Sequence, residues 1–130
     1  MTHLSNFATV DPFNGMNEEN PGKCQNLVSG QWRDAANYFD NVPDPINGES
    51  FIRVPNTQNV DDFIENLASC PKSGLHNPLK NVERYVMLGN VCAKAAEVMR
   101  DKEVEDFFVR LIQRVMPKAD NQCFGEVKVT

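Results

Sequence analysis

Apolar residues recur at helical spacing in the second half of the chain. The clearest stripe predicts a helix over 101–116 and consists of Val104, Phe107, Phe108, Leu111, Ile112 and Val115. Asp101 can start this helix, and Pro117 stops it. A longer helix is expected over 81–99, with one face made of Tyr85, Leu88, Cys92, Ala95, Ala96 and Met99. A shorter one is expected over 59–69, where Val60, Phe63, Ile64, Leu67 and Ala68 repeat.

Details of this pattern predict how the helices pack. Gly89 weakens the 81–99 helix by about 1 kcal/mol relative to alanine, so close packing is expected there. Cys92 lies on the apolar face and is expected to be a buried, reduced thiol. Two interpretations of the Val104–Val115 stripe stay open. It is core packed on the 81–99 helix, or it is a face on which a partner docks.

The first half of the chain has turn signals and short β-type runs. Residues 1–26 are polar and turn-rich, and we interpret them as an extended arm. Leu27-Val28 and Trp32 flank a tight hairpin turn, and two further strands are expected around Tyr38–Val42 and Phe51–Val54. An Asn-Gly turn separates these two strands. Together with three to four helices, the pattern predicts an α+β fold with short edge strands.

Composition excludes several classes of protein. The 130 residues are the size of one domain, which we place at 27–130 after the arm. A net charge of −5 argues against a nucleic-acid-binding module. No apolar run is long enough to cross a bilayer, so direct membrane insertion is not expected. The N-terminus has neither a secretory h-region nor an Arg-rich presequence.

Candidate chemistry is sparse. The four cysteines are isolated from one another, and the two histidines are too few for a zinc site of usual spacing. Cys123 has no neighbouring His or Lys to lower its pKa, so it is interpreted as a small packing or surface residue. His76 is interpreted as a hydrogen-bonding loop residue. We therefore expect no catalytic residue, no metal site and no cofactor site in this chain.

Several stretches nevertheless resemble one enzyme family. They occur in order along the chain and comprise Phe7–Val10, Asn26–Trp32, Asp44–Val54, Cys70–Lys80, Glu83–Tyr85, Asp106–Lys118 and Gly125–Val127. The set resembles the amino-terminal region of plant-type Δ1-pyrroline-5-carboxylate dehydrogenases, a branch of the aldehyde dehydrogenase superfamily. The Gly-x-Trp hairpin and the Asp-Pro-x-Asn-Gly turn are shared widely among aldehyde dehydrogenases. The 70–80 and 106–118 stretches look specific to this branch.

The resemblance implies an NAD-dependent oxidation of glutamate semialdehyde, usually in mitochondria. It also implies that this segment forms edge strands and helices on the surface of the nucleotide-binding domain. The catalytic cysteine, the general-base glutamate and the cofactor groove of the family come later in the chain and have no counterpart in residues 1–130. The final segment, 118–130, carries no helix stop signal, and we expect a partial domain truncated before these regions.

Three functions are consistent with these expectations. The first is a non-catalytic accessory subunit that docks on a larger, mitochondrial protein assembly. The second is the N-terminal piece of a working NAD-dependent dehydrogenase, and the third is a decoy that docks on the full-length enzyme. For a protein partner, the candidate binding residues are Phe107, Leu111, Phe124, Val127 and Val129.

Overall fold

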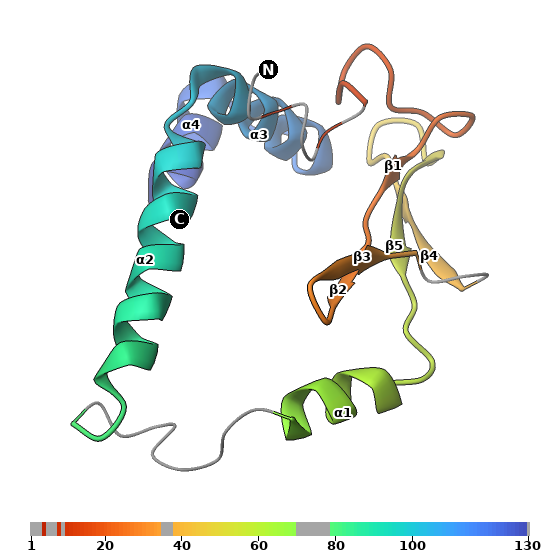
Figure 1. Ribbon diagram of the computed structural model, residues 1–130. Helices are drawn as coiled ribbons and strands as arrows, with labels where there is room; N and C mark the ends of the chain where they lie inside the picture. Colours follow the sequence, from red (N-terminus) through yellow and green to blue (C-terminus); the bar gives the residue numbers. More distant parts are fainter. Residues whose placement is uncertain (1–3, 5–7, 9, 35–37, 70–78, 130) are drawn as a thin grey trace.

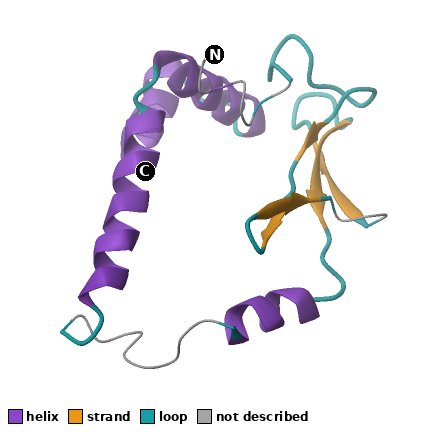
Figure 2. Ribbon diagram, viewed as in Figure 1, coloured by secondary structure: helices purple, strands orange, loops and turns teal. Residues whose placement is uncertain are grey.

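The computed structural model describes residues 4, 8, 10–34, 38–69 and 79–129. Among these residues five short strands precede four helices, which confirms the α+β class (Figures 1 and 2). Residues 70–78, which include most of the 70–80 stretch and the predicted loop residue His76, lie outside the described residues. No helix among the described residues is long and apolar enough to cross a membrane.

The larger sheet contains three strands in the order β1-β5-β4. β4 (Phe39–Pro43) and β5 (Ser50–Pro55) pair antiparallel around the predicted Asn-Gly turn, in which Gly48 has φ of +78°. This positive φ explains why a glycine follows Asn47. β1 (Gly22–Lys23) lies parallel to β5 on its other side, so the predicted arm contributes a strand to the sheet.

The second sheet is the predicted hairpin. β2 (Asn26–Val28) pairs antiparallel with β3 (Gln31–Arg33), and Val28 lies opposite Gln31. Ser29 and Gly30 form the two-residue turn with φ of +51° and +74°. Two successive positive φ values are typical of type I′ turns, whose twist suits a hairpin.

The first three helices begin and end close to the predicted residues, and the fourth lies in the final segment, for which no bounds were predicted. α1 is Asp61–Ala68, α2 is Val82–Met99, α3 is Lys102–Val115 and α4 is Asp120–Val129. Asp101 caps α3 as expected, because its side chain accepts a hydrogen bond from the backbone N–H of Glu103. Asn59 accepts one from the N–H of Asp61 at the start of α1.

The helical core lies between α3 and α4. Val109, Cys123 and Val127 are buried together, with the partly buried Met99, Phe108 and Ile112 packed against them. The expectation that the α3 stripe packs on the 81–99 helix was therefore wrong for most of its length. Only Met99, the last residue of α2, reaches this cluster, because α2 leads away from α3 (Figure 1).

α2 departs from the prediction in two further respects. Cys92 is exposed, not buried, because no other described element covers its side of the helix. The close packing expected at Gly89 is also absent, since a Cβ atom placed there would meet nothing within 4 Å. No residue of this 18-residue helix is buried.

Candidate functional site

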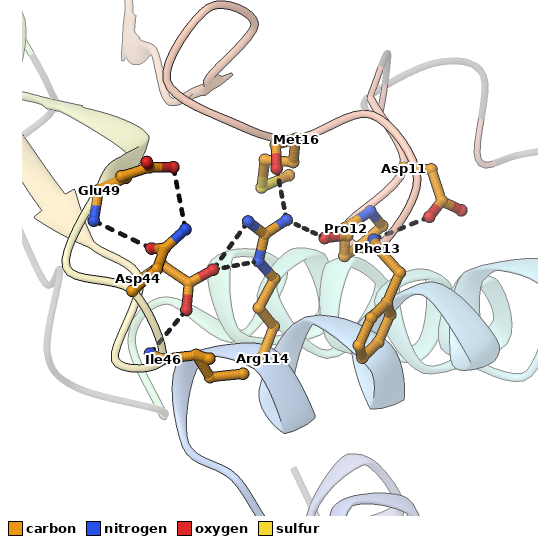
Figure 3. A network of polar contacts seen from close by, with 9 residues as sticks. Asp11, Pro12, Phe13, Met16, Asp44, Ile46, Glu49 and Arg114 are labelled. Carbon is orange, nitrogen blue, oxygen red and sulfur yellow. Dashed lines mark hydrogen bonds and ion pairs between the residues drawn. The ribbon is translucent and has the colours of Figure 1, made fainter.

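A largely buried arginine joins three segments that are far apart in the sequence (Figure 3). Arg114, near the end of α3, donates to Oδ2 of Asp44 from Nε at 2.9 Å and from Nη2 at 2.8 Å. Its Nη1 donates to the backbone carbonyls of Pro12 and Met16 in the arm. The guanidinium also lies 4.5 Å from the ring centre of Phe51, which is fully buried in β5.

Asp44 is the anionic partner in this junction. Its side chain is 6% exposed, and that of Arg114 is 12% exposed. A hydrogen bond from the backbone N–H of Ile46 lowers the pKa of Asp44, burial opposes this shift, and Arg114 lowers the pKa further. The carboxylate is therefore ionised at neutral pH and fully engaged by protein groups.

A second arginine of α3 holds the arm one turn earlier. Arg110 pairs with Asp11, whose carboxylate also accepts hydrogen bonds from the N–H groups of Phe13 and Asn14. Partial burial raises the pKa of Asp11, but these hydrogen bonds and Arg110 outweigh it and leave the pKa lowered. Because these groups neutralise each other within the chain, the junction is a structural clamp.

The sequence did not indicate that Arg110 and Arg114 hold the arm and the Asp44 turn against α3. Arg110 and Arg114 both lie in the helix predicted over 101–116, and Arg114 adjoins its apolar stripe, where a cation needs a buried partner. The aspartates were visible only as members of turn motifs. The sequence shows that Arg114 lies beside an apolar stripe and so needs an acidic partner. It does not show that this partner is Asp44.

The five candidate partner-binding residues do not form one exposed patch. Phe107 and Val127 are buried inside the chain, and Leu111 is partly buried. Phe107 and Leu111 line a largely apolar cavity of about 190 Å³ between the arm, the sheet and α3. Phe124 and Val129 are exposed on α4. Of the five, these two are accessible to a partner without rearrangement of the chain.

Larger exposed apolar surfaces lie on other elements. In α2 the apolar side chains that are more than two-fifths exposed are Val82, Tyr85, Val86, Met87, Leu88 and Val91. The hairpin exposes Leu27 and Trp32, and α1 exposes Ile64 and Leu67. Exposed apolar surface of this extent marks protein contacts in soluble proteins.

The described residues contain no arrangement typical of catalysis. No group of three or more His, Cys, Asp or Glu among them could hold a metal ion. Cys123 is buried in the core between α3 and α4, which confirms its interpretation as a packing residue. A cleft of about 300 Å³ lies between the hairpin and the start of α1, but its ionic groups Arg33 and Asp62 pair with each other at 2.8 Å.

Comparison with known proteins shows which proteins this chain is similar to. No family model matches the sequence. In an alignment of 131 positions that covers 99% of this chain, it is 43% identical to a protein of Linum usitatissimum named "Probable aldehyde dehydrogenase". It is 42% identical over 132 residues to the protein of Arabidopsis thaliana named "Delta-1-pyrroline-5-carboxylate dehydrogenase 12A1, mitochondrial".

The chain is similar to plant aldehyde dehydrogenases over its full length. This confirms the resemblance to Δ1-pyrroline-5-carboxylate dehydrogenases that the sequence motifs indicated. The matched region is 23% of the length of each relative, so the chain spans about a quarter of these proteins. The other three-quarters of a relative have no counterpart among these residues.

Proposed function

We propose that this chain is a non-catalytic accessory subunit that binds protein, and that its partner is the part of an aldehyde dehydrogenase that the chain itself does not match. The observation that carries the proposal is the amount of exposed surface. The chain exposes 9693 Å². A compact monomer of 14.7 kDa exposes roughly 6,900 Å².

The difference, roughly 2,700 Å², is large by the standard of protein interfaces. One partner in a stable complex buries about 800 Å² on its own side. The surplus area is therefore about three times the area that one partner buries in a stable complex. A chain with this much surplus surface is suited to lie against a larger body or against several partners.

The composition of α2 supports the same conclusion. Met87 and Val91 lie on one side of this helix, while Val82 and Val86 lie toward the other. All four are more than half exposed. A helix with apolar residues on both sides is ordinarily buried on both sides. A shallow hollow of about 520 Å³ is lined by all four of these residues and gives a partner side chain a place to dock.

The relatives suggest the chemistry of this partner and its location. Both are named as aldehyde dehydrogenases, and one is named as mitochondrial. We accordingly place the accessory subunit on a mitochondrial assembly that contains an aldehyde dehydrogenase. The catalytic cysteine and glutamate and the NAD site belong to that partner in this proposal.

A reconstitution experiment tests the proposal. The Linum relative is produced without the region that matches this chain, and the purified chain is titrated into it. We expect saturable one-to-one binding. The chain alone should reduce no NAD with glutamate semialdehyde. Binding should weaken about tenfold or more when Met87→Gln and Val91→Gln are combined.

The matched control is Glu18→Gln, which places the same residue at an exposed position of the arm. This variant should bind as the wild type does. Two results would overturn the proposal. One is semialdehyde oxidation by the chain alone, and the other is an absence of binding to the shortened relative.

A second candidate is that the chain is the N-terminal part of a working glutamate-semialdehyde dehydrogenase of proline catabolism. The specific support is the identity of 42–43% over 99–100% of the chain. Exchange of the matching region of the Linum relative for this chain distinguishes the candidates. A single polypeptide with full activity favours the second, whereas activity only with a separate accessory chain favours the first.

A further inference from the structure

We propose that Asn14 is a site of spontaneous deamidation, at which water converts the side-chain amide to a carboxylate and thereby loosens the arm at the Arg114 clamp. The chain contains two Asn-Gly pairs, Asn14-Gly15 and Asn47-Gly48. Sequence alone gives the two pairs the same reactivity, because glycine follows the asparagine in each. The structure distinguishes them. This inference goes beyond the proposed function and does not rest on it.

The reaction needs only the chain and water. The backbone nitrogen of Gly15 attacks Cγ of Asn14, and the bond between Cγ and Nδ2 breaks. The nitrogen that leaves takes up the amide proton of Gly15 and departs as ammonia, so a cyclic succinimide remains. Water then opens this ring at either carbonyl. The product is aspartate, or isoaspartate, in which the main chain continues through the former side chain. Glycine favours the attack because it has no side chain beside the attacking nitrogen.

The side-chain amide of Asn47 is held at both ends. Its Nδ2 donates to Oε2 of Glu49 at 2.9 Å, and its Oδ1 accepts from the backbone N–H of Glu49 at 3.0 Å. The second bond closes an Asx-turn. Loss of Nδ2 as ammonia breaks the first bond, and the carboxylate of Glu49 opposes the negative charge that develops on Oδ1 during the attack. The turn therefore protects Asn47.

The side-chain amide of Asn14 has none of this protection. It is exposed, and no hydrogen bond from the described residues holds it. The backbone N–H of Asn14 donates to Oδ1 of Asp11 at 3.0 Å, which fixes the main chain and leaves the side chain free to change its rotamer. The amide can therefore turn its Cγ toward the nitrogen of Gly15 without breaking a contact.

The attacking nitrogen is also easier to release at Gly15. Its N–H donates to the carbonyl of Asp11 at 3.1 Å, whereas the N–H of Gly48 donates to the carbonyl of Asp44 at 2.7 Å. The carbonyl of Asp11 also accepts from the N–H of Met16 at 2.9 Å. It keeps this donor when Gly15 turns away, so no unsatisfied carbonyl opposes the attack.

Modification at Asn14 changes the arm where the clamp holds it. Asn14 lies between Pro12 and Met16, the two residues whose carbonyls accept from Nη1 of Arg114. Figure 3 shows Pro12 and Met16 on the same side of the guanidinium. Isoaspartate adds a methylene group to the main chain between them. Because one nitrogen binds both carbonyls, a change in their spacing breaks one of the bonds and loosens the arm.

Peptide mapping by mass spectrometry measures both sites while the full chain is incubated at mildly alkaline pH. In the folded chain Asn14 should react about tenfold or more faster than Asn47, because two hydrogen bonds hold the amide of Asn47. In concentrated urea the two rates should become equal, since the denaturant removes the turns and leaves both Asn-Gly pairs.

Two substitutions test the cause of the difference. Glu49→Ala removes the acceptor of Nδ2 and should speed the reaction at Asn47 without changing that at Asn14. Asn14→Gln is the matched control, because the longer side chain forms the corresponding ring much more slowly. This variant should stay unmodified at residue 14 throughout the incubation.

Hydrogen exchange measures the effect on the arm. The isoaspartate form of the aged chain is separated by chromatography, and the amides of Gly15 and Met16 should exchange faster in it than in the fresh chain. Asn14→Asp adds the charge without lengthening the main chain. It should therefore exchange as the wild type does when freshly purified.

The inference fails if Asn47 reacts as fast as Asn14 in the folded chain, or if the difference between them persists in urea. It also fails if isoaspartate at residue 14 leaves exchange in the arm unchanged. None of these measurements involves α2 or the shortened dehydrogenase, so their outcome is independent of the proposed function.

Discussion

α3 and α2 are neighbouring helices that differ in what covers their apolar residues. In α3 the side chains of Val104, Phe107 and Val109 are buried; Phe107 faces the arm and the sheet, and Val109 packs against α4. In α2 the side chains of Val86 and Val91 are 56% and 61% exposed. Hydrophobicity alone does not distinguish these helices. The difference teaches that α3 finds its packing partners among the described residues, whereas our proposal assigns those of α2 to another protein.

Of the predicted changes, loss of the Arg114 clamp should lower the unfolding free energy most. Arg114→Ala leaves the buried carboxylate of Asp44 without its partner, and we expect a loss of about 3–5 kcal/mol in the free energy of unfolding. Urea denaturation followed by circular dichroism measures it. Arg33→Ala is the control, because the exposed Arg33–Asp62 pair should contribute no more than about 1 kcal/mol. Equal losses in the two variants would contradict the buried clamp.

The same substitution in the two helices sharpens the comparison. Val104→Ala removes two methyl groups from a fully buried site, so we expect a loss of about 2–3 kcal/mol in unfolding free energy. Val91→Ala should change it by less than about 0.5 kcal/mol in the dilute chain. Denaturation at low micromolar concentration avoids association. A large loss at Val91 would show that α2 is covered within the chain.

Acid should lower the unfolding free energy of the packed region by protonating Asp44. The pKa of Asp44 is lowered in the folded chain, mainly by the N–H of Ile46 and also by Arg114. A lowered folded-state pKa means that this stabilisation is complete above the unfolded pKa of about 3.9 and is lost as the pH falls through the folded-state value. Stability should therefore be flat above about pH 5 and fall below about pH 4. In Asp44→Asn this part of the decline should disappear.

The smallest expected effect concerns Gly89. In the dilute chain its replacement by alanine meets no atom, so Gly89→Ala should raise the unfolding free energy by about 0.5–1 kcal/mol. Gly30→Ala should do the opposite, because its φ of +74° disfavours any side chain. Thermal unfolding at matched concentration measures both. Destabilisation by Gly89→Ala would contradict the open environment of α2.

Much of the fold could be predicted from local sequence. The hairpin, the turn at Asn47-Gly48 and the cap at Asp101 follow from interactions within a few residues, and each is confirmed. Two predictions were wrong, namely that Cys92 is buried and that α3 packs along the 81–99 helix. Both depended on contacts between residues distant in sequence. Helical periodicity identifies an apolar face but does not identify what covers it.

The clamp shows the same limit for polar residues. Arg114 contacts Asp44 and the arm across 70 and 98–102 positions of sequence. No spacing rule connects residues so far apart. The turn residues and the arginine could each be recognised, but their meeting depends on how the arm lies against α3.

Hydrogen exchange of the α2 amides tests most directly whether this helix is built to be covered by protein. The exchange of Val82–Met99 is compared in the dilute chain and in its mixture with the Linum relative that lacks the matching region. The proposed function predicts fast exchange in the dilute chain and strong protection in the mixture. Exchange that stays equally fast in the mixture, or strong protection already in the dilute monomer, would contradict it.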